Sequence, residues 1–128
     1  MKQKTKTMIN LKGKSAILYR RVSTTDQKQF GNSLNAQRDS LRDFCIKNSM
    51  NIVKEFQEDY SAKNFNRPEW KKLNDFAKKN KKDIDYLFVV DWDRFSRNVY
   101  DALGVINDFK NIGIEVNCID KWINYKDP

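Results

Sequence analysis

Apolar and polar residues alternate along this chain in blocks that predict four strands. Residues 15–22 form an apolar, β-prone run, and residues 51–57 alternate in the manner of a second strand. Residues 84–90 are almost continuously apolar, which is typical of a central parallel strand covered on both faces. Residues 114–119 complete the set with a fourth short strand.

Three helices are predicted between these strands. Ser33 is a candidate N-cap for the first, which runs to about Asn48. The second starts at Pro68, a residue suited to a first helical turn, and the third is terminated by Gly113. Apolar residues recur at helical spacing in all three. They are Leu34, Leu41, Phe44 and Cys45 in the first helix, the buried stripe Trp70, Leu73, Phe76 and Ala77 in the second, and Val99, Ala102, Leu103, Ile106 and Phe109 in the third.

The element order βαβαβαβ predicts an α/β fold. We expect an open, mainly parallel sheet of four or slightly more strands, with right-handed crossovers and helices on both faces. A length of 128 residues and an apolar content of 39% suit one domain with a single modest core. This domain is predicted to span residues 15–128, after a basic, flexible tail at residues 1–14.

The net charge indicates the kind of molecule that the protein binds, and the cysteines indicate the cellular compartment. The net charge of +8 favours a polyanionic partner, although residues 1–14 hold five lysines and no acid, which leaves +3 on the remainder. No segment resembles a signal peptide or a membrane span. Cys45 and Cys118 lie in separate apolar segments, and we expect buried thiols in a reducing cytoplasm. Without histidine, two cysteines make no zinc site, so no metal is expected.

Polar clusters follow three of the predicted strands. Ser23 follows the first, residues 61–67 follow the second, and residues 91–97 follow the third. The carboxyl ends of parallel strands share one edge of a sheet, which is where ligands bind. Arg21 stands two positions before Ser23, so on a strand both side chains project to the same face. Arg94 and Arg97 are three residues apart and share one side of a helical turn.

Each of these residues has an ordinary explanation when taken alone. Ser23 suits a turn or a helix cap, and the arginines suit surface ion pairs with Asp91, Asp93 or Asp101. Jointly they favour a phosphate site in which Ser23 attacks and fixed guanidiniums stabilise the transition state. The chain has no histidine, which excludes Ser-His-Asp chemistry. Three routes to deprotonate Ser23 stay open: Asp93 as the base, Asp93 as an arginine-orienting group, or an arginine that lowers the pKa of the hydroxyl.

Four motifs in this order resemble the catalytic domain of the serine site-specific recombinases, the resolvase and invertase family. They are YRRVSTTDQ (19–27), SLNAQRDSL (33–41), DYSAKNFNRPEW (59–70) and DRFSR (93–97). The similarity covers about residues 15–125, and the long stretch between Gln27 and Ser33 resembles the large serine recombinases. The resemblance implies a nucleophilic Ser23. It also implies catalytic Arg21, Arg67, Asp93, Arg94 and Arg97, and DNA-binding or site-supporting Gln27, Gln37 and Ser61.

This resemblance implies cleavage and rejoining of double-stranded DNA through a 5′-phosphoserine intermediate, with no cofactor. It implies a homodimer and a synaptic homotetramer for a full-length protein that acts in the cytoplasm, on the nucleoid. Family members continue into a dimerisation helix and a DNA-binding region, which we expect this chain to lack, and a monomer is then one option. Integration, inversion, resolution and transposition all stay open.

Two rival functions are weighed against this one. A catalytically silent DNA-binding or assembly domain of the same fold would need a broken motif, whereas all the expected reactive positions are occupied. A flavodoxin-like or receiver-like binding module shares the element order. However, the chain has only four glycines, which form no phosphate loop, and no paired acids end the first strand.

Overall fold

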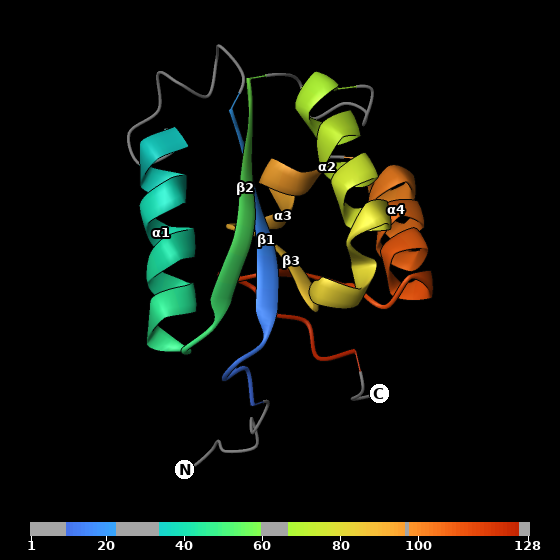
Figure 1. Cartoon of the computed structure of the whole chain (residues 1–128). Helices are drawn as coiled ribbons and strands as arrows, with labels where there is room; N and C mark the ends of the chain where they lie inside the picture. The colour runs from blue at the N-terminus through green and yellow to red at the C-terminus, as the bar shows by residue number, and fades with distance from the viewer. Residues whose placement is uncertain (1–9, 23–33, 60–66, 97, 126–128) are drawn as a thin grey trace.

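The computed structural model describes residues 10–22, 34–59, 67–96 and 98–125, and these form an α/β fold (Figure 1). The elements in chain order are β1 (Ser15–Val22), α1 (Leu34–Lys47), β2 (Asn51–Asp59), α2 (Pro68–Lys79), the 3-10 turn η3 (Lys81–Asp83), β3 (Tyr86–Val89), α3 (Trp92–Phe95), α4 (Val99–Asn111) and β4 (Glu115–Cys118). The four strands pair in parallel in the order β2-β1-β3-β4. The predicted fold class is confirmed, including the interior position of β3.

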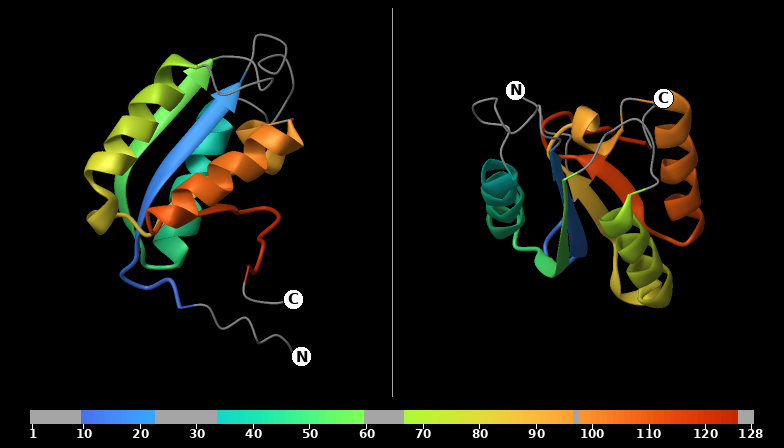
Figure 2. Two further views of the ribbon diagram at one scale, coloured as in Figure 1. Left: turned by 90° about the vertical axis from the view of Figure 1, so that its right-hand side faces the viewer. Right: turned by 90° about the horizontal axis from the view of Figure 1, so that it is seen from above.

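Helices cover both faces of this sheet. Helix α1 lies on one face, whereas α2, α3 and α4 lie on the other, as the view from above shows (Figure 2). On the α1 side, Leu41 and Cys45 pack with Leu18 and Phe88. On the other side, the α2 residues Trp70, Leu73 and Ala77 pack with Tyr19 and Phe95, among others. Each strand face therefore has its own apolar cluster, which accounts for the nearly continuous apolar run of β3.

The path of the chain creates a switch point between β1 and β3. From β1 the chain passes through α1 to β2, and it then returns through α2 on the opposite face to β3, on the other side of β1. The connections from β1 and β3 thus leave the sheet in opposite directions. Open parallel sheets bind ligands at such points, outside the carboxyl ends of the strands.

A bulge in β2 changes which of its side chains face α2. Ala16 pairs with Ile52 but Ile17 pairs with Lys54, so Val53 is an extra residue. Ile52 packs on the α1 side and Phe56 on the α2 side, although residues four apart share a face in a regular strand. The bulge therefore places Phe56 and the buried Glu58 on the α2 side of the sheet, whereas Glu55 and Gln57 face α1.

The structure differs from the prediction in several respects, and β3 and β4 are shorter than the predicted 84–90 and 114–119. Strand β2 runs to Asp59, so Glu58 belongs to a strand and not to the polar loop expected there. The one-turn helix α3 occupies part of the segment expected to be a loop after β3. In α4 only Phe109 is buried, while Val99 and Leu103 are 69% and 59% exposed, because no described residue covers that face of the helix.

Other sequence predictions have mixed outcomes. Pro68 does open α2, and both cysteines are buried free thiols. Ser33, the candidate N-cap, lies outside the described residues. So do residues 1–9 of the predicted tail, but Leu11 from the same segment is buried in the α1-side cluster. Packing of the domain thus starts before residue 15.

Candidate active site

Four of the predicted site residues have described side chains, and three of them are buried. Arg21 and Arg67 have no exposed surface, Gln37 is 3% exposed, and Asp93 is exposed. Arg94 lies in α3, where only its main chain is described. Ser23, Gln27, Ser61 and Arg97 lie outside the described residues, so their predicted roles stay predictions.

Arg21 joins the end of β1 to the start of α3. Its Nη2 donates a hydrogen bond to the main-chain carbonyl of Asp93 at 3.1 Å, across 72 positions of sequence. This contact spans the switch point between β1 and β3, as predicted for the two clusters. Asp93 thus contacts Arg21 through its main-chain carbonyl oxygen, and its side chain is exposed.

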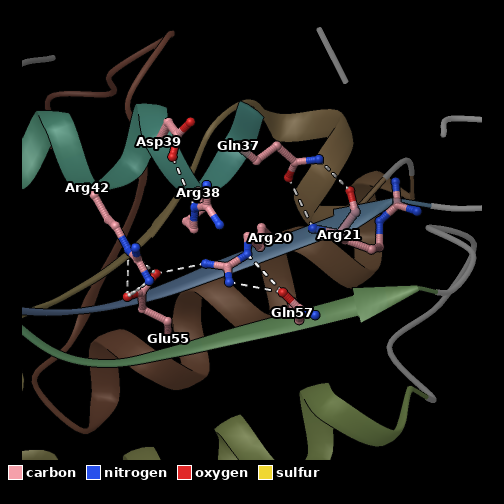
Figure 3. A network of polar contacts seen from close by, with 8 residues as sticks. All are labelled: Arg20, Arg21, Gln37, Arg38, Asp39, Arg42, Glu55 and Gln57. Carbon is pink, nitrogen blue, oxygen red and sulfur yellow. Dashed lines mark hydrogen bonds and ion pairs between the residues drawn. The ribbon is translucent and has the colours of Figure 1, made fainter. Parts of the chain in front are cut away.

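Gln37 fixes the main chain at Arg21 (Figure 3). Its Oε1 accepts from the Arg21 N–H at 3.1 Å, and its Nε2 donates to the Arg21 carbonyl at 2.9 Å. Strand β1 pairs with β3 only at Ala16, Ile17 and Leu18. The carboxamide therefore supplies, beyond the end of that pairing, the two bonds that a neighbouring strand would make. Gln37 thus holds the last part of β1, and its role in the reaction stays a prediction.

Arg67 is held by two residues that the sequence analysis did not single out. Its Nη1 donates to the hydroxyl of Tyr19 at 3.1 Å, and that hydroxyl donates to Oε1 of Glu58 at 3.1 Å. Burial raises the pKa of the Tyr19 phenol, and the nearby Arg67 offsets this only in part, so the phenol keeps its proton. The alternation that linked Arg21 to Ser23 could have pointed to Tyr19, which stands two positions earlier.

Arg20 lies on the opposite face of the sheet from its neighbour Arg21 and contacts different residues. It projects to the α1 side of the sheet, where it contacts Glu55 at 2.8 Å and Gln57 at 3.0 Å (Figure 3). Arg42 of α1 binds the same Glu55 carboxylate at 2.9 Å. Burial works against the charge of Glu55, but the hydrogen bonds from the two arginines lower its pKa overall. Surface ion pairing, weighed above for the other arginines, thus describes Arg20 and Arg42.

A cavity of about 390 Å³ lies away from these residues. It is lined at the opposite edge of the sheet by residues such as Lys14, Tyr86 and Tyr125. None of the predicted site residues contributes to it, so it is not part of the candidate site. Within the residues that the model describes, no helix is both long and apolar enough to cross a membrane.

A parallel sheet with helices on both faces and a switch point between β1 and β3 makes this a doubly wound α/β domain, a class that binds its ligands outside the carboxyl ends of the strands. Comparison with known proteins then gives the family. The family model described as "Resolvase, N terminal domain" matches residues 16–128. The chain therefore belongs to the resolvase family, and it is a serine recombinase catalytic domain whose function is site-specific recombination of DNA.

Solved structures agree with this assignment. The N-terminal catalytic domain of TP901-1 integrase is 26% identical, with a TM-score of 0.76 over 86% of this chain and 80% of that one. A resolvase family site-specific recombinase from Streptococcus pneumoniae is also 26% identical, with a TM-score of 0.73 over 89% and 78%. The C-terminal catalytic domain of ISC1926 TnpA, an IS607-like serine recombinase, is 21% identical with a TM-score of 0.71 over 84% and 70%, and supports the fold. No curated protein matches the chain in the corresponding comparison.

Proposed function

We propose that Ser23 is the nucleophile of the recombination reaction. Its Oγ attacks the phosphorus of a DNA phosphodiester, a bond forms between Oγ and phosphorus, and the bond from phosphorus to the 3′ oxygen breaks. The serine proton leaves with a base, and the freed 3′ oxygen takes up a proton. The 3′ hydroxyl of a new partner strand then gives up its proton and attacks the phosphorus, the bond from phosphorus to Ser23 Oγ breaks, and the serine takes up a proton, which restores the diester. Because the ester retains the bond energy, the cycle needs no cofactor.

The contact between Arg21 and Asp93 is the observation that supports this proposal most strongly. It brings the strand that leads to Ser23 against the segment that contains Arg94. Ser23 stands two positions after Arg21, and alternate strand residues share a face. If the extended chain of β1 continues by one residue, the Ser23 hydroxyl is expected on the side of the sheet on which Arg21 meets α3.

The arginines have a common role in the proposed reaction. The phosphorane-like transition state carries added negative charge on its oxygens, which preorganised cations stabilise best in a site that excludes water. Arg21 and Arg67 are buried and held by protein partners, so they are preorganised. We assign the same task to Arg94 and Arg97 from their motif, and supporting contacts to Gln27, Gln37 and Ser61.

The Asp93 contact also bears on how Ser23 loses its proton. This contact is made by the main-chain carbonyl of Asp93, and it holds the Arg21 guanidinium near the end of the strand that leads to Ser23. The Asp93 carboxyl group keeps both of its possible roles. A neighbouring guanidinium then lowers the pKa of the serine hydroxyl. For the whole protein we propose a homodimer that forms a synaptic homotetramer in the cytoplasm, on nucleoid DNA, with residues 15–128 as the catalytic domain.

Covalent trapping tests the proposal. The full-length protein is incubated with a labelled duplex that carries its recombination site, and protein–DNA adducts are separated on a denaturing gel. We expect an adduct with the wild type and none with Ser23→Ala, whereas Ser40→Ala, which removes an exposed hydroxyl on α1, keeps it. An adduct that persists in Ser23→Ala would remove Ser23 from the role. The absence of any adduct from the wild type would favour a catalytically silent assembly domain.

A further inference from the structure

Positive charge is concentrated on α2 and on the turn η3 that follows it. Residues 69–83 hold six lysines and three acids, so their net charge of +3 equals that of the whole segment 15–128. The rest of that segment is therefore neutral overall. All six lysines are exposed, and together they form what we call the lysine surface: Lys71, Lys72, Lys78, Lys79, Lys81 and Lys82.

The lysine surface faces away from the sheet. Lys71 and Lys78 are seven residues apart, as are Lys72 and Lys79, so the members of each pair lie on the same side of α2, about two turns apart. The other two lysines follow directly in η3. The opposite side of α2 packs on the sheet through its three buried residues, which are Trp70, Leu73 and Ala77.

Few acids neutralise this charge. Lys72 binds Glu69 at 3.0 Å, which is the one ion pair of the lysine surface within the described ranges 10–22, 34–59, 67–96 and 98–125. Lys78 and Lys79 lie in the last turn of α2, where the helix dipole favours a cation. The dipole accounts for one or two lysines but not for six, because like charges at such short spacing repel each other. A polyanionic ligand would offset this repulsion.

Most of the lysine surface lies away from the candidate active site. Helix α2 starts after Arg67 at the carboxyl ends of the strands and runs to the opposite edge of the sheet (Figure 1). There the Asp85 N–H donates to the carbonyl of Ser15, the first residue of β1, at 2.8 Å. Arg21 stands six residues further along β1, which is about 20 Å in a strand. A ligand bound at η3 is therefore not at the reacting phosphate.

We propose that the lysine surface binds the phosphate backbone of duplex DNA, at a contact separate from the catalytic site and without sequence preference. The family recombines DNA, so this polyanion is present whenever the protein acts. Lysine presents a point charge on a flexible stem, which suits phosphates of any sequence. The inference does not depend on the role proposed for Ser23.

The composition of the lysine surface favours DNA over a protein partner. Within residues 68–83, all of which the structure describes, no large apolar side chain is exposed. Protein interfaces have an apolar centre and are depleted in lysine. Lysines clustered along one helix, without an apolar centre, are instead typical of contacts with a nucleic acid backbone.

Salt-dependent DNA binding tests the inference. The 128-residue chain is titrated into a labelled duplex of unrelated sequence at about 50 and about 200 mM salt, and binding is followed by fluorescence anisotropy. The variant Lys78→Gln/Lys79→Gln is compared with the control Lys47→Gln/Lys110→Gln, with folding checked by circular dichroism. All four lysines are exposed in the last turn of a helix, so the two variants lose the same charge and the same dipole contact.

The expected result is a weaker salt dependence for Lys78→Gln/Lys79→Gln alone. Each phosphate contact adds about 0.9 to the slope of log K against log salt concentration. Removal of two contacts should therefore make the loss of affinity between the two salt concentrations about tenfold smaller than in the wild type. The control should follow the wild type, and adding Lys81→Gln/Lys82→Gln should reduce the salt dependence further.

Two results would overturn the inference. One is wild-type salt dependence in Lys78→Gln/Lys79→Gln, which would leave the lysines as a solvated helix end or as a contact for another partner. The other is an equal change in both double variants, which would assign the binding to net charge and not to this surface. Ser23→Ala should bind the unrelated duplex as the wild type does, so failure of the nucleophile assignment leaves this test unaffected.

Discussion

The carboxamide of Gln37 bonds both main-chain groups of Arg21, as acceptor to its N–H at 3.1 Å and as donor to its carbonyl at 2.9 Å. One side chain of α1 thus holds the last part of β1, the strand that leads to Ser23. The bonds are buried, so no water replaces them if the side chain is lost.

Gln37→Ala should therefore destabilise the domain and slow DNA cleavage. Two buried main-chain groups lose their partner, which costs on the order of 2 to 4 kcal/mol of unfolding free energy. Urea unfolding measures this cost, and Asn35→Ala, at an exposed position of the same helix, should stay within about 0.5 kcal/mol of the wild type. Equal stabilities for the two variants would show that Gln37 does not hold the strand.

The two apolar stripes of α2 and α4 should respond differently to truncation. Leu73 is fully buried on α2, so Leu73→Ala should cost about 2 to 5 kcal/mol of unfolding free energy. Leu103 on α4 is 59% exposed, and Leu103→Ala should change the stability of this chain by less than about 0.5 kcal/mol. Thermal or urea unfolding of both variants checks the contrast, and a large loss for Leu103→Ala would mean that the α4 stripe is covered in solution.

Two glycines should respond to alanine in opposite directions. Gly113 ends α4 with φ of 86°, where an alanine side chain is strained, so Gly113→Ala should destabilise by about 1 kcal/mol. Gly104 lies inside α4 with nothing within 4 Å of an added Cβ, so Gly104→Ala should stabilise by about 0.5 to 1 kcal/mol. The melting temperatures of the two variants test this prediction. Shifts of the same sign relative to the wild type would contradict it.

Glu55 should contribute to the pH dependence of stability. Arg42 and Arg20 outweigh burial and lower its pKa below the ordinary value of 4.5, so its charge stabilises the fold above that pH. This contribution is lost as the pH falls through the lowered pKa. Glu55→Gln should therefore be less stable than the wild type at pH 7, with a gap that closes toward pH 3.

The exposed pair of Arg38 and Asp39 provides the control for this titration. Asp39→Asn should show no such gap at pH 7, because an exposed ion pair contributes little. A gap for Glu55→Gln that does not change with pH would show that the charge of Glu55 is not its source.

Periodicity predicted the fold well because burial on two faces is visible in the sequence. The bounds of β1 match residues 15–22, and Pro68 and Gly113 mark helix ends through their own backbone preferences. The exposure of the apolar residues of α4 could not be predicted. Apolar spacing shows that a helix has an apolar face, but it does not show what packs against that face.

The site was predicted in part. Strand alternation and the sheet edge brought Arg21 and the Asp93 segment together, and the structure confirms their contact. Glu58 could not be found in this way. The bulge at Val53 changes which face the later residues of β2 occupy, and a carboxylate before a polar loop has the pattern of a solvated residue. Its burial depends on Tyr19 and on the start of α2.

The most direct test of the proposed mechanism maps the covalent bond to one residue. The trapped adduct is digested with nuclease and trypsin, and the peptide of residues 22–28, VSTTDQK, is fragmented in a mass spectrometer. We expect the nucleotide remnant on Ser23. A remnant on Thr24 or Thr25, or on any other peptide, would contradict the assignment of Ser23 as the nucleophile.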